Sequence, residues 1–282
     1  MLTEAYDIWT DDDVDDEAGE RPRLPAGWAD HAGPGIDVRT WPRSPRTGQP
    51  MLHCFTLWLP EAYRRRGPDL VAVAVFQWED ELYFKDPAPE ITTIMAGGPV
   101  DVAQPEHPFW AELARARAHP RLQVADDGVA SLLAMVWLTE AELNGPRVAR
   151  PTAAPSLADG EVDNTSWRAR HGVYGSLWLV PRDDPNAGVP PVSFPSDGDA
   201  YVDVPDRFDV FHAEHLGGTD MSPDGVRDGL SPWYIEVCRL GGISFGGDLD
   251  IALDLENDAF LGDWSTAVRI PGTDAGQPTP PR

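Results

Sequence analysis

The chain has 282 residues, of which 41% are hydrophobic, and 47 acidic residues against 22 basic ones give it a formal net charge of −25 at pH 7. A chain of this length and composition can bury a core, and its 29 prolines and 26 glycines favour many short elements over a helical bundle. This net negative charge repels phosphate backbones and anionic lipid surfaces, so we expect neither nucleic acid nor a membrane as a partner. It attracts a basic protein, although the acidity can also serve solubility alone.

We expect a cytoplasmic protein without a disulfide framework. The N-terminus shows no basic segment followed by an apolar one, and the apolar run at 129–138 is too short to span a bilayer. Cys54 and Cys238 are the only cysteines, and each lies in an apolar run, which predicts that it packs as a small hydrophobic residue.

Residues 1–22 are predicted to form a mobile acidic arm, because a block of like charges repels itself. The acidic residues of this block are Asp11, Asp12, Asp13, Asp15, Asp16 and Glu17. Residues 27–50 are rich in proline and glycine, which indicates irregular chain held in place by Trp28 and Trp41.

The next part of the chain predicts a β-meander. Residues 51–59 place apolar side chains on both faces of an extended segment, which indicates an interior strand. Residues 70–78 form a second strand, rich in β-branched and aromatic residues. After a tight turn we expect two further short strands, at 82–84 and 91–95.

Helical patterns begin after this meander. Residues 108–118 carry apolar residues at helical spacing, and Pro120 ends the pattern. Residues 129–143 fit either a helix or a strand at 133–138 that leads into a helical turn at 139–142, and we favour the strand followed by the turn.

The remaining chain resumes after a long connection at 145–168, rich in proline, alanine and aspartate. A strand is expected at 173–180 and a helix at 206–216. Apolar runs at 233–240 and 249–255 predict two strands, and glycine pairs between them mark turns or bulges.

These elements predict one compact domain over residues 23–270. Two halves, 23–145 and 169–270, are the alternative division within it. The tail at 271–282 has no apolar pattern, so we expect it to be disordered.

Two separated stretches carry short motifs in a familiar order. The first contains Trp41-Pro42, Gly48-Gln49-Pro50-Met51-Leu52-His53, Leu59-Pro60-Glu61 and the strand VAVAVFQ; the second contains His215-Leu216-Gly217-Gly218, the strand WYIEVCRL, Gly246-Gly247-Asp248-Leu249-Asp250 and Phe260. In these motifs the chain resembles the YwqG-like family of bacterial proteins. The resemblance implies a mainly β fold with roll-like antiparallel sheets, a few short helices (α+β) and internal duplication, and it brings no catalytic residues.

The sequence His212-Ala213-Glu214-His215 suggests a metal site, because two imidazoles at i and i+3 on a helix share one face. The ligands of this hypothesis are His212, Glu214 and His215, with Asp206, Asp220, Asp248 or Asp250 as carboxylates that folding can bring close. The alternative is a capping and packing role at a helix end. The carboxylates after Gly246-Gly247 lack calcium-loop spacing, so we expect solvent-facing strand residues there.

No nucleotide-binding glycine loop, nucleophile elbow or Cys-x-x-Cys motif occurs in the chain, and we expect no cofactor. The sequence therefore favours a non-enzymatic, immunity- or adaptor-like module whose acidic surface binds a basic protein. We expect Asp11, Asp12, Asp13, Asp15, Asp16, Trp28 and Trp41 to form its partner-binding surface. The alternative is a metal-assisted hydrolase that uses the His/Glu/His cluster.

Overall fold

The computed structural model describes residues 4–16, 23–44, 47–79, 89–102, 104–126, 131–154, 172–193, 195–196, 198–222, 230–243, 249–254, 260–262, 265–266 and 268–269. Within these ranges the chain is mainly β, with short helices between the strands, as its composition and patterning predict. None of the helices in the described ranges has the length and apolarity needed to cross a membrane.

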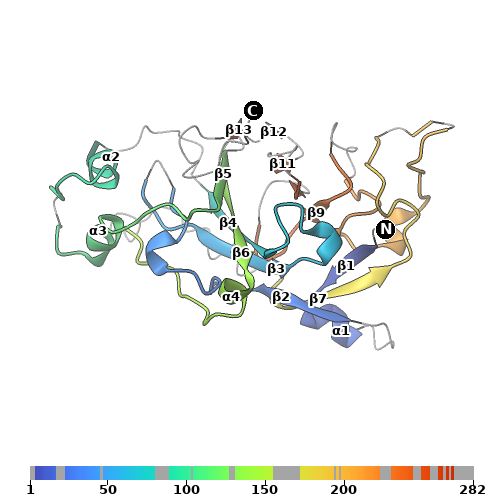
Figure 1. Ribbon diagram of the computed structural model, residues 1–282, viewed down its shortest axis with the longest axis horizontal. Helices are drawn as coiled ribbons and strands as arrows, with labels where there is room; N and C mark the ends of the chain where they lie inside the picture. The colour runs from blue at the N-terminus through green and yellow to red at the C-terminus, as the bar shows by residue number, and fades with distance from the viewer. Residues whose placement is uncertain are drawn as a thin grey trace.

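The strands form a single curled antiparallel sheet (Figure 1). Its strand order is β12-β11-β10-β9-β8-β1-β7-β2-β3-β4-β6-β5-β13. The strands are β1 (Ala5–Trp9), β2 (Leu24–Ala29), β3 (Leu52–Trp58), β4 (Leu70–Glu79), β5 (Leu122–Asp126), β6 (Ser131–Thr139), β7 (Gly175–Arg182), β8 (His215–Leu216), β9 (Tyr234–Val237), β10 (Leu249–Ala252), β11 (Phe260–Gly262), β12 (Ser265–Thr266) and β13 (Val268–Arg269). Strands of both predicted halves belong to this sheet, because β2 pairs with β7.

The helical elements are short and lie outside the sheet. They are α1 (Asp11–Asp16), α2 (Pro89–Met95), α3 (Pro108–Leu113), α4 (Glu140–Leu143), α6 (Arg207–Val210) and the 3₁₀ turns η1 (Val38–Thr40) and η2 (Glu61–Tyr63). α2 and α3 lie together at one end of the molecule, where Ile91, Ile94, Phe109 and Leu113 form a small apolar cluster (Figure 1).

Several predicted elements are confirmed. The strands expected at 51–59 and 70–78 are β3 and β4, and both faces of β4 are buried: Val73 and Val75 pack in one apolar cluster, Ala74 and Phe76 in another. The strand and helical turn expected at 133–142 are β6 and α4. A capping box at Thr139 starts α4, because its hydroxyl accepts from the Glu142 amide while Glu142 accepts from the Thr139 amide.

The prediction of a mobile arm is wrong for residues 5–16. β1 lies inside the sheet between β7 and β8, and all five of its residues are buried. Ala5 pairs with Arg182 and Trp9 with Trp178, so the strand belongs to the core. The acidic block that follows β1 begins as the helix α1, and residues 17–22 lie outside the described ranges.

Two other predictions are corrected. The segment predicted as a strand at 91–95 is the helix α2, whose buried residues Ile91 and Ile94 are three apart, and Pro89 at its first position favours a helix start. Of the helix predicted at 206–216, only α6 (Arg207–Val210) is helical, and His215 lies in the strand β8. The predicted strand at 82–84 and the tail at 271–282 lie outside the described residues.

Candidate functional site

The aromatic residues of the predicted partner-binding surface are buried. Trp41 is 2% exposed, and its indole N–H donates to the Met51 carbonyl at 2.9 Å. Trp28 is 7% exposed, donates to the Ala32 carbonyl, and is covered by the Arg147 guanidinium at 4.3 Å from the ring centroid. The prediction that these two side chains meet a partner is therefore wrong, because both already pack inside the fold.

The acidic residues of that prediction differ in their surroundings. The Asp11 carboxylate accepts from the Ser176 amide at 2.8 Å and from the Trp178 indole, which joins α1 to β7. Asp13 accepts from the amide and hydroxyl of Thr10. Asp12 is exposed, and the side chains of Asp15 and Asp16 are outside the described part of the structure. Asp11 and Asp13 thus help to hold the N-terminal strand in place.

The predicted metal ligands His212, Glu214 and His215 do not converge. His212 faces Asp13 at 3.4 Å, whereas the Glu214 carboxylate accepts from the backbone amides of Cys238 and Arg239. His215, in β8, faces Glu236 instead. Because α6 ends at Val210, His212 and His215 do not share a helix face, which removes the geometric basis of the prediction.

A different part of the chain exposes apolar and acidic side chains together, and we call residues 192–210 the acidic-apolar segment. Seven large hydrophobic side chains are exposed among the described residues, and four belong to this segment: Val192 (37%), Val202 (43%), Phe208 (59%) and Val210 (63%). Asp199, Asp203, Asp206 and Asp209 are exposed between them. A concentration of exposed apolar side chains in one segment marks an interaction surface more often than scattered single residues do.

Hydrogen bonds fix the backbone of this segment to the body of the protein. Asn186 is buried, and its side-chain amide both donates to the Val202 carbonyl at 2.9 Å and accepts from the Val202 amide at 2.8 Å. The Arg207 guanidinium donates to the Ser222 carbonyl at 3.0 Å. Tyr201 is 6% exposed, and its hydroxyl accepts from the Asp220 amide. The exposed side chains are therefore presented on an anchored backbone.

Asp206 has a left-handed backbone conformation, with φ of 56°. It is the sole non-glycine residue with positive φ among the described residues. A non-glycine residue in this region costs roughly 1–3 kcal/mol and persists only where the surrounding structure imposes the conformation, and such residues cluster at functional sites. Asp206 directly precedes α6 and thereby sets the direction in which Phe208 and Val210 leave the body of the protein.

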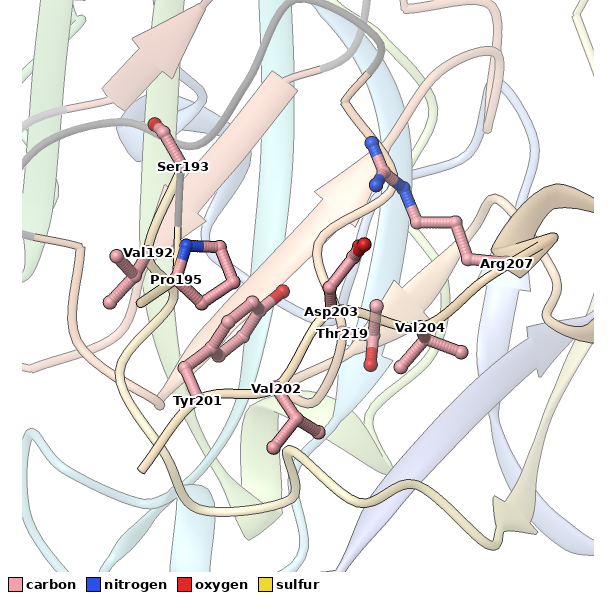
Figure 2. Close-up of a pocket in the computed structure, with 9 residues that line it drawn as sticks. All are labelled: Val192, Ser193, Pro195, Tyr201, Val202, Asp203, Val204, Arg207 and Thr219. Atoms are coloured by element: carbon pink, nitrogen blue, oxygen red, sulfur yellow. The ribbon is translucent and has the colours of Figure 1, made fainter. Parts of the chain in front are cut away.

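A shallow pocket lies within the same segment (Figure 2). Figure 2 shows the side chains that line it, among them Tyr201, Asp203, Val192, Pro195 and Val202. It offers about 30 Å³, which is room for one or two water molecules. The pocket is too small for a substrate, so what the segment offers a ligand is its surface.

A buried charge network supports the segment from below. Arg182 is 3% exposed and pairs with Asp184 at 2.8 Å and with Asp7 of β1 at 3.2 Å. Its guanidinium also donates to the Thr219 carbonyl, and Asp184 accepts from the Thr219 amide and hydroxyl. This network joins β7, β1 and the loop that follows β8.

Asp220, whose amide donates to the Tyr201 hydroxyl, forms a cluster of three buried carboxylates with Glu236 and Asp250. They are 2%, 1% and 4% exposed, and one oxygen of each lies within 4.8 Å of the other two. Asp250 is the direct cross-strand neighbour of Glu236 in the β9–β10 pairing. Like charges directly opposite each other on a sheet are destabilising, so this cluster requires a compensating charge or proton.

The nearest imidazole does not supply that charge by itself. His215 Nε2 lies 2.6 Å from Glu236 Oε2, and burial lowers the pKa of His215 well below its usual value. A depressed pKa favours the neutral ring. Burial and the neighbouring carboxylates of Asp220, Glu236 and Asp250 raise the pKa of Tyr234, so its hydroxyl stays protonated and donates to the Gly218 carbonyl.

From sequence, Asp220 and Asp250 are predicted only as additional carboxylates near the His/Glu/His cluster, and Asp250 is predicted to face solvent. Both residues are buried. The cluster has no sequence motif, because its members come from a loop and two strands and meet only through strand pairing. The acidic-apolar segment does have a sequence signal, five aspartates among apolar residues, although the sequence predicts only a helix from residue 206 there.

Comparisons with known proteins add no family: no family model, no curated protein and no solved structure matches the chain.

Proposed function

We propose that this protein is a non-enzymatic interaction module whose acidic surface binds a basic protein, in the manner of an immunity or adaptor protein. The observation that carries the proposal is the acidic-apolar segment, where exposed carboxylates alternate with exposed apolar side chains on an anchored backbone. The net charge of −25 supports it by steering cationic partners toward the protein. The motifs that resemble those of the YwqG-like family are compatible with a non-enzymatic interaction module, and membership of that family is part of the proposal.

The test is capture from a lysate of the native host at low salt, followed by elution with rising salt and identification of the retained proteins. The proposal expects one basic protein in a fixed molar ratio, with an affinity that falls steeply as salt screens the charges. Purified partner and protein should then form a complex whose dissociation constant is measured by calorimetry. Failure to find any basic protein that binds in a salt-sensitive manner overturns the proposal.

A second candidate function is cation binding, and the cluster of Asp220, Glu236 and Asp250 favours it. These carboxylates replace the predicted ligands His212, Glu214 and His215. Carboxylate oxygens are the ligands that Ca²⁺ and Mg²⁺ prefer, and a divalent cation would relieve the repulsion between Glu236 and Asp250. Because the three residues are at most 4% exposed, a substrate cannot reach the ion. The geometry therefore supports an ion that stabilises the fold over metal-assisted hydrolysis.

Thermal unfolding of chelator-treated protein with and without Ca²⁺, Mg²⁺ or Mn²⁺ tests this candidate. Saturating cation should raise the Tm by about 5–10 °C, the shift expected for roughly 2–3 kcal/mol of ligand stabilisation. Asp250→Asn should be more stable than the native protein without cation and should lose the response to it. Asp69→Asn, at an exposed position, is the matched control. An unchanged Tm with all three ions rejects cation binding.

A further inference from the structure

The acidic-apolar segment constrains what its partner must present, and this inference rests on the proposed function. The segment's described residues include four exposed aspartates, Asp199, Asp203, Asp206 and Asp209, and one arginine, Arg207. The Arg207 guanidinium donates to the Ser222 carbonyl and lies 4.8 Å from the centroid of the Phe208 ring, so it is engaged with its own chain. The surface offered to a partner is therefore negative as well as apolar.

Most kinds of occupant are incompatible with this combination. Nucleic acid and anionic lipid are repelled by the aspartates. A second copy of the chain would bring the same negative segment against itself, with like charges juxtaposed across the interface. A purely apolar partner would desolvate the carboxylates without compensating them, and a purely cationic one would leave Phe208 and Val210 in water.

We infer that the acidic-apolar segment binds a cationic amphipathic segment of the partner protein, whose apolar side chains cover Val202, Phe208 and Val210 while its lysines or arginines pair with Asp203, Asp206 and Asp209. The exposed aromatic residue is the centre of the interface, since aromatic side chains dominate binding energy where they become buried. The hydrogen bonds of Asn186 to Val202 and of Arg207 to Ser222 hold the surface in place before binding, which lowers the entropy lost on association.

Two synthetic peptides test this inference without knowledge of the natural partner. One is a fluorescent peptide of lysine and leucine that forms an amphipathic helix, and the other has the same lysines with every leucine replaced by serine. Binding of each peptide to the full chain is measured by fluorescence anisotropy over a range of salt concentrations. The lysine–leucine peptide should bind about tenfold more tightly, because only it covers the apolar side chains.

Two variants and a matched control locate the binding site. Phe208→Ser combined with Val210→Ser should reduce the affinity for the lysine–leucine peptide to within about twofold of that for the lysine–serine peptide. Asp203→Asn with Asp206→Asn and Asp209→Asn should weaken both peptides and flatten the salt dependence. Asparagine tolerates the left-handed backbone at position 206. The control, Glu61→Gln with Asp69→Asn and Glu90→Gln, removes three exposed carboxylates elsewhere and should bind as the native protein does.

The outcomes separate this inference from the proposed function. If the control variant loses as much affinity as the aspartate variant, or if the serine variant binds normally, the acidic-apolar segment is not the docking site, although the protein still binds cationic partners. If neither peptide binds the native protein at low salt, the inference fails, whereas the proposed function fails only if the lysate yields no basic protein that binds in a salt-sensitive manner. Circular dichroism of each variant confirms that the fold is retained.

Discussion

His215 Nε2 lies 2.6 Å from Glu236 Oε2, and the two side chains are 0% and 1% exposed. The other ring nitrogen, Nδ1, lies 3.0 Å from the Gly217 carbonyl, so the imidazole is held between β9 and the glycine turn after β8. Glu236 Oε2 also accepts from the Met221 amide at 2.8 Å. One buried pair thereby fixes the loop that carries Asp220.

Replacing His215 and replacing Glu236 should lower the free energy of unfolding by different amounts. His215→Leu should lower the free energy of unfolding by about 3 kcal/mol, because it removes a partner of a buried carboxylate. Glu236→Gln should cost less, because it also removes the repulsion with Asp250 on the neighbouring strand. Urea unfolding of both variants and of the double variant measures the difference and the coupling. Equal losses would show that Asp250 does not repel Glu236.

Arg182 joins distant parts of the sheet, so its replacement should be among the most damaging at a single position. Arg182→Met should cost about 3–5 kcal/mol, because it leaves Asp7 and Asp184 buried without their guanidinium. Arg182→Lys keeps the charge but loses the forked geometry, so its loss should be smaller but measurable. Hydrogen exchange should show faster opening at Thr219 and Asp220 in both variants. A Met variant as stable as the native protein would contradict this role.

Tyr63 is fully buried, and its hydroxyl donates to the carbonyls of Glu4 at 2.8 Å and Leu216 at 3.2 Å. Tyr63→Phe should lower the free energy of unfolding by about 1–2 kcal/mol, because it leaves buried carbonyls without this donor. Tyr6→Phe is the matched control. The Tyr6 hydroxyl bonds the carboxylate of exposed Glu4, so we expect a loss below about 0.5 kcal/mol there. Chemical denaturation distinguishes the two, and equal losses would count against the assignment.

The Asp13–His212 pair should make stability depend on pH. Burial opposes the charge on both groups, but their mutual hydrogen bond raises the pKa of His212 and, with the Thr10 contacts, lowers the pKa of Asp13 to about 2. The raised pKa of His212 stabilises the fold at pH values below its unfolded pKa, which is near 6.5. This stabilisation is lost as the pH rises through its folded pKa. The lowered pKa of Asp13 stabilises the fold at pH values above about 3.8, the unfolded pKa, and this stabilisation is lost as the pH falls toward the folded pKa of about 2.

Asp13→Asn should therefore cost about 1 kcal/mol between roughly pH 4 and 6.5 and less at pH 8.5, the magnitude being reduced because both side chains are about one third exposed. Urea unfolding at pH 5.5 and 8.5 measures the two values. Asp12→Asn, at the exposed neighbouring position, should show no such pH dependence. A loss that grows with pH would reverse the assigned sign.

The sequence predicted the mainly β class and those strands that their own residue pattern identifies. β3, β4 and β6 are long and apolar, so their patterns identify them without reference to any partner. β1 has only five residues beside an acidic block, and it is a strand because β7 and β8 pair with both its edges. α2 contains a β-branched run that favours a strand locally, yet its two isoleucines are buried at helical spacing against α3.

The candidate site was less accessible to sequence reasoning for the same reason. Glu236 and Asp250 meet through the register of β9 and β10, which no local pattern specifies. Trp28 and Trp41 belong to a stretch rich in proline and glycine, where exposure and packing give the same sequence signal. The structure places Trp28 in β2 and buries both side chains. Exposure of Phe208 depends on where α6 ends and on the left-handed backbone at Asp206, neither of which composition reveals.

The position of β1 has a consequence for biosynthesis. Ala5–Trp9 emerges from the ribosome well before its partners, because β7 and β8 are translated some 170 and 210 residues later respectively. At about 5–20 residues per second, an apolar segment with two open edges waits on the order of ten seconds or more before the centre of the sheet can close. Charged residues next to such a segment suppress aggregation of nascent chains. The aspartates of α1 are placed where they can protect the strand during that interval.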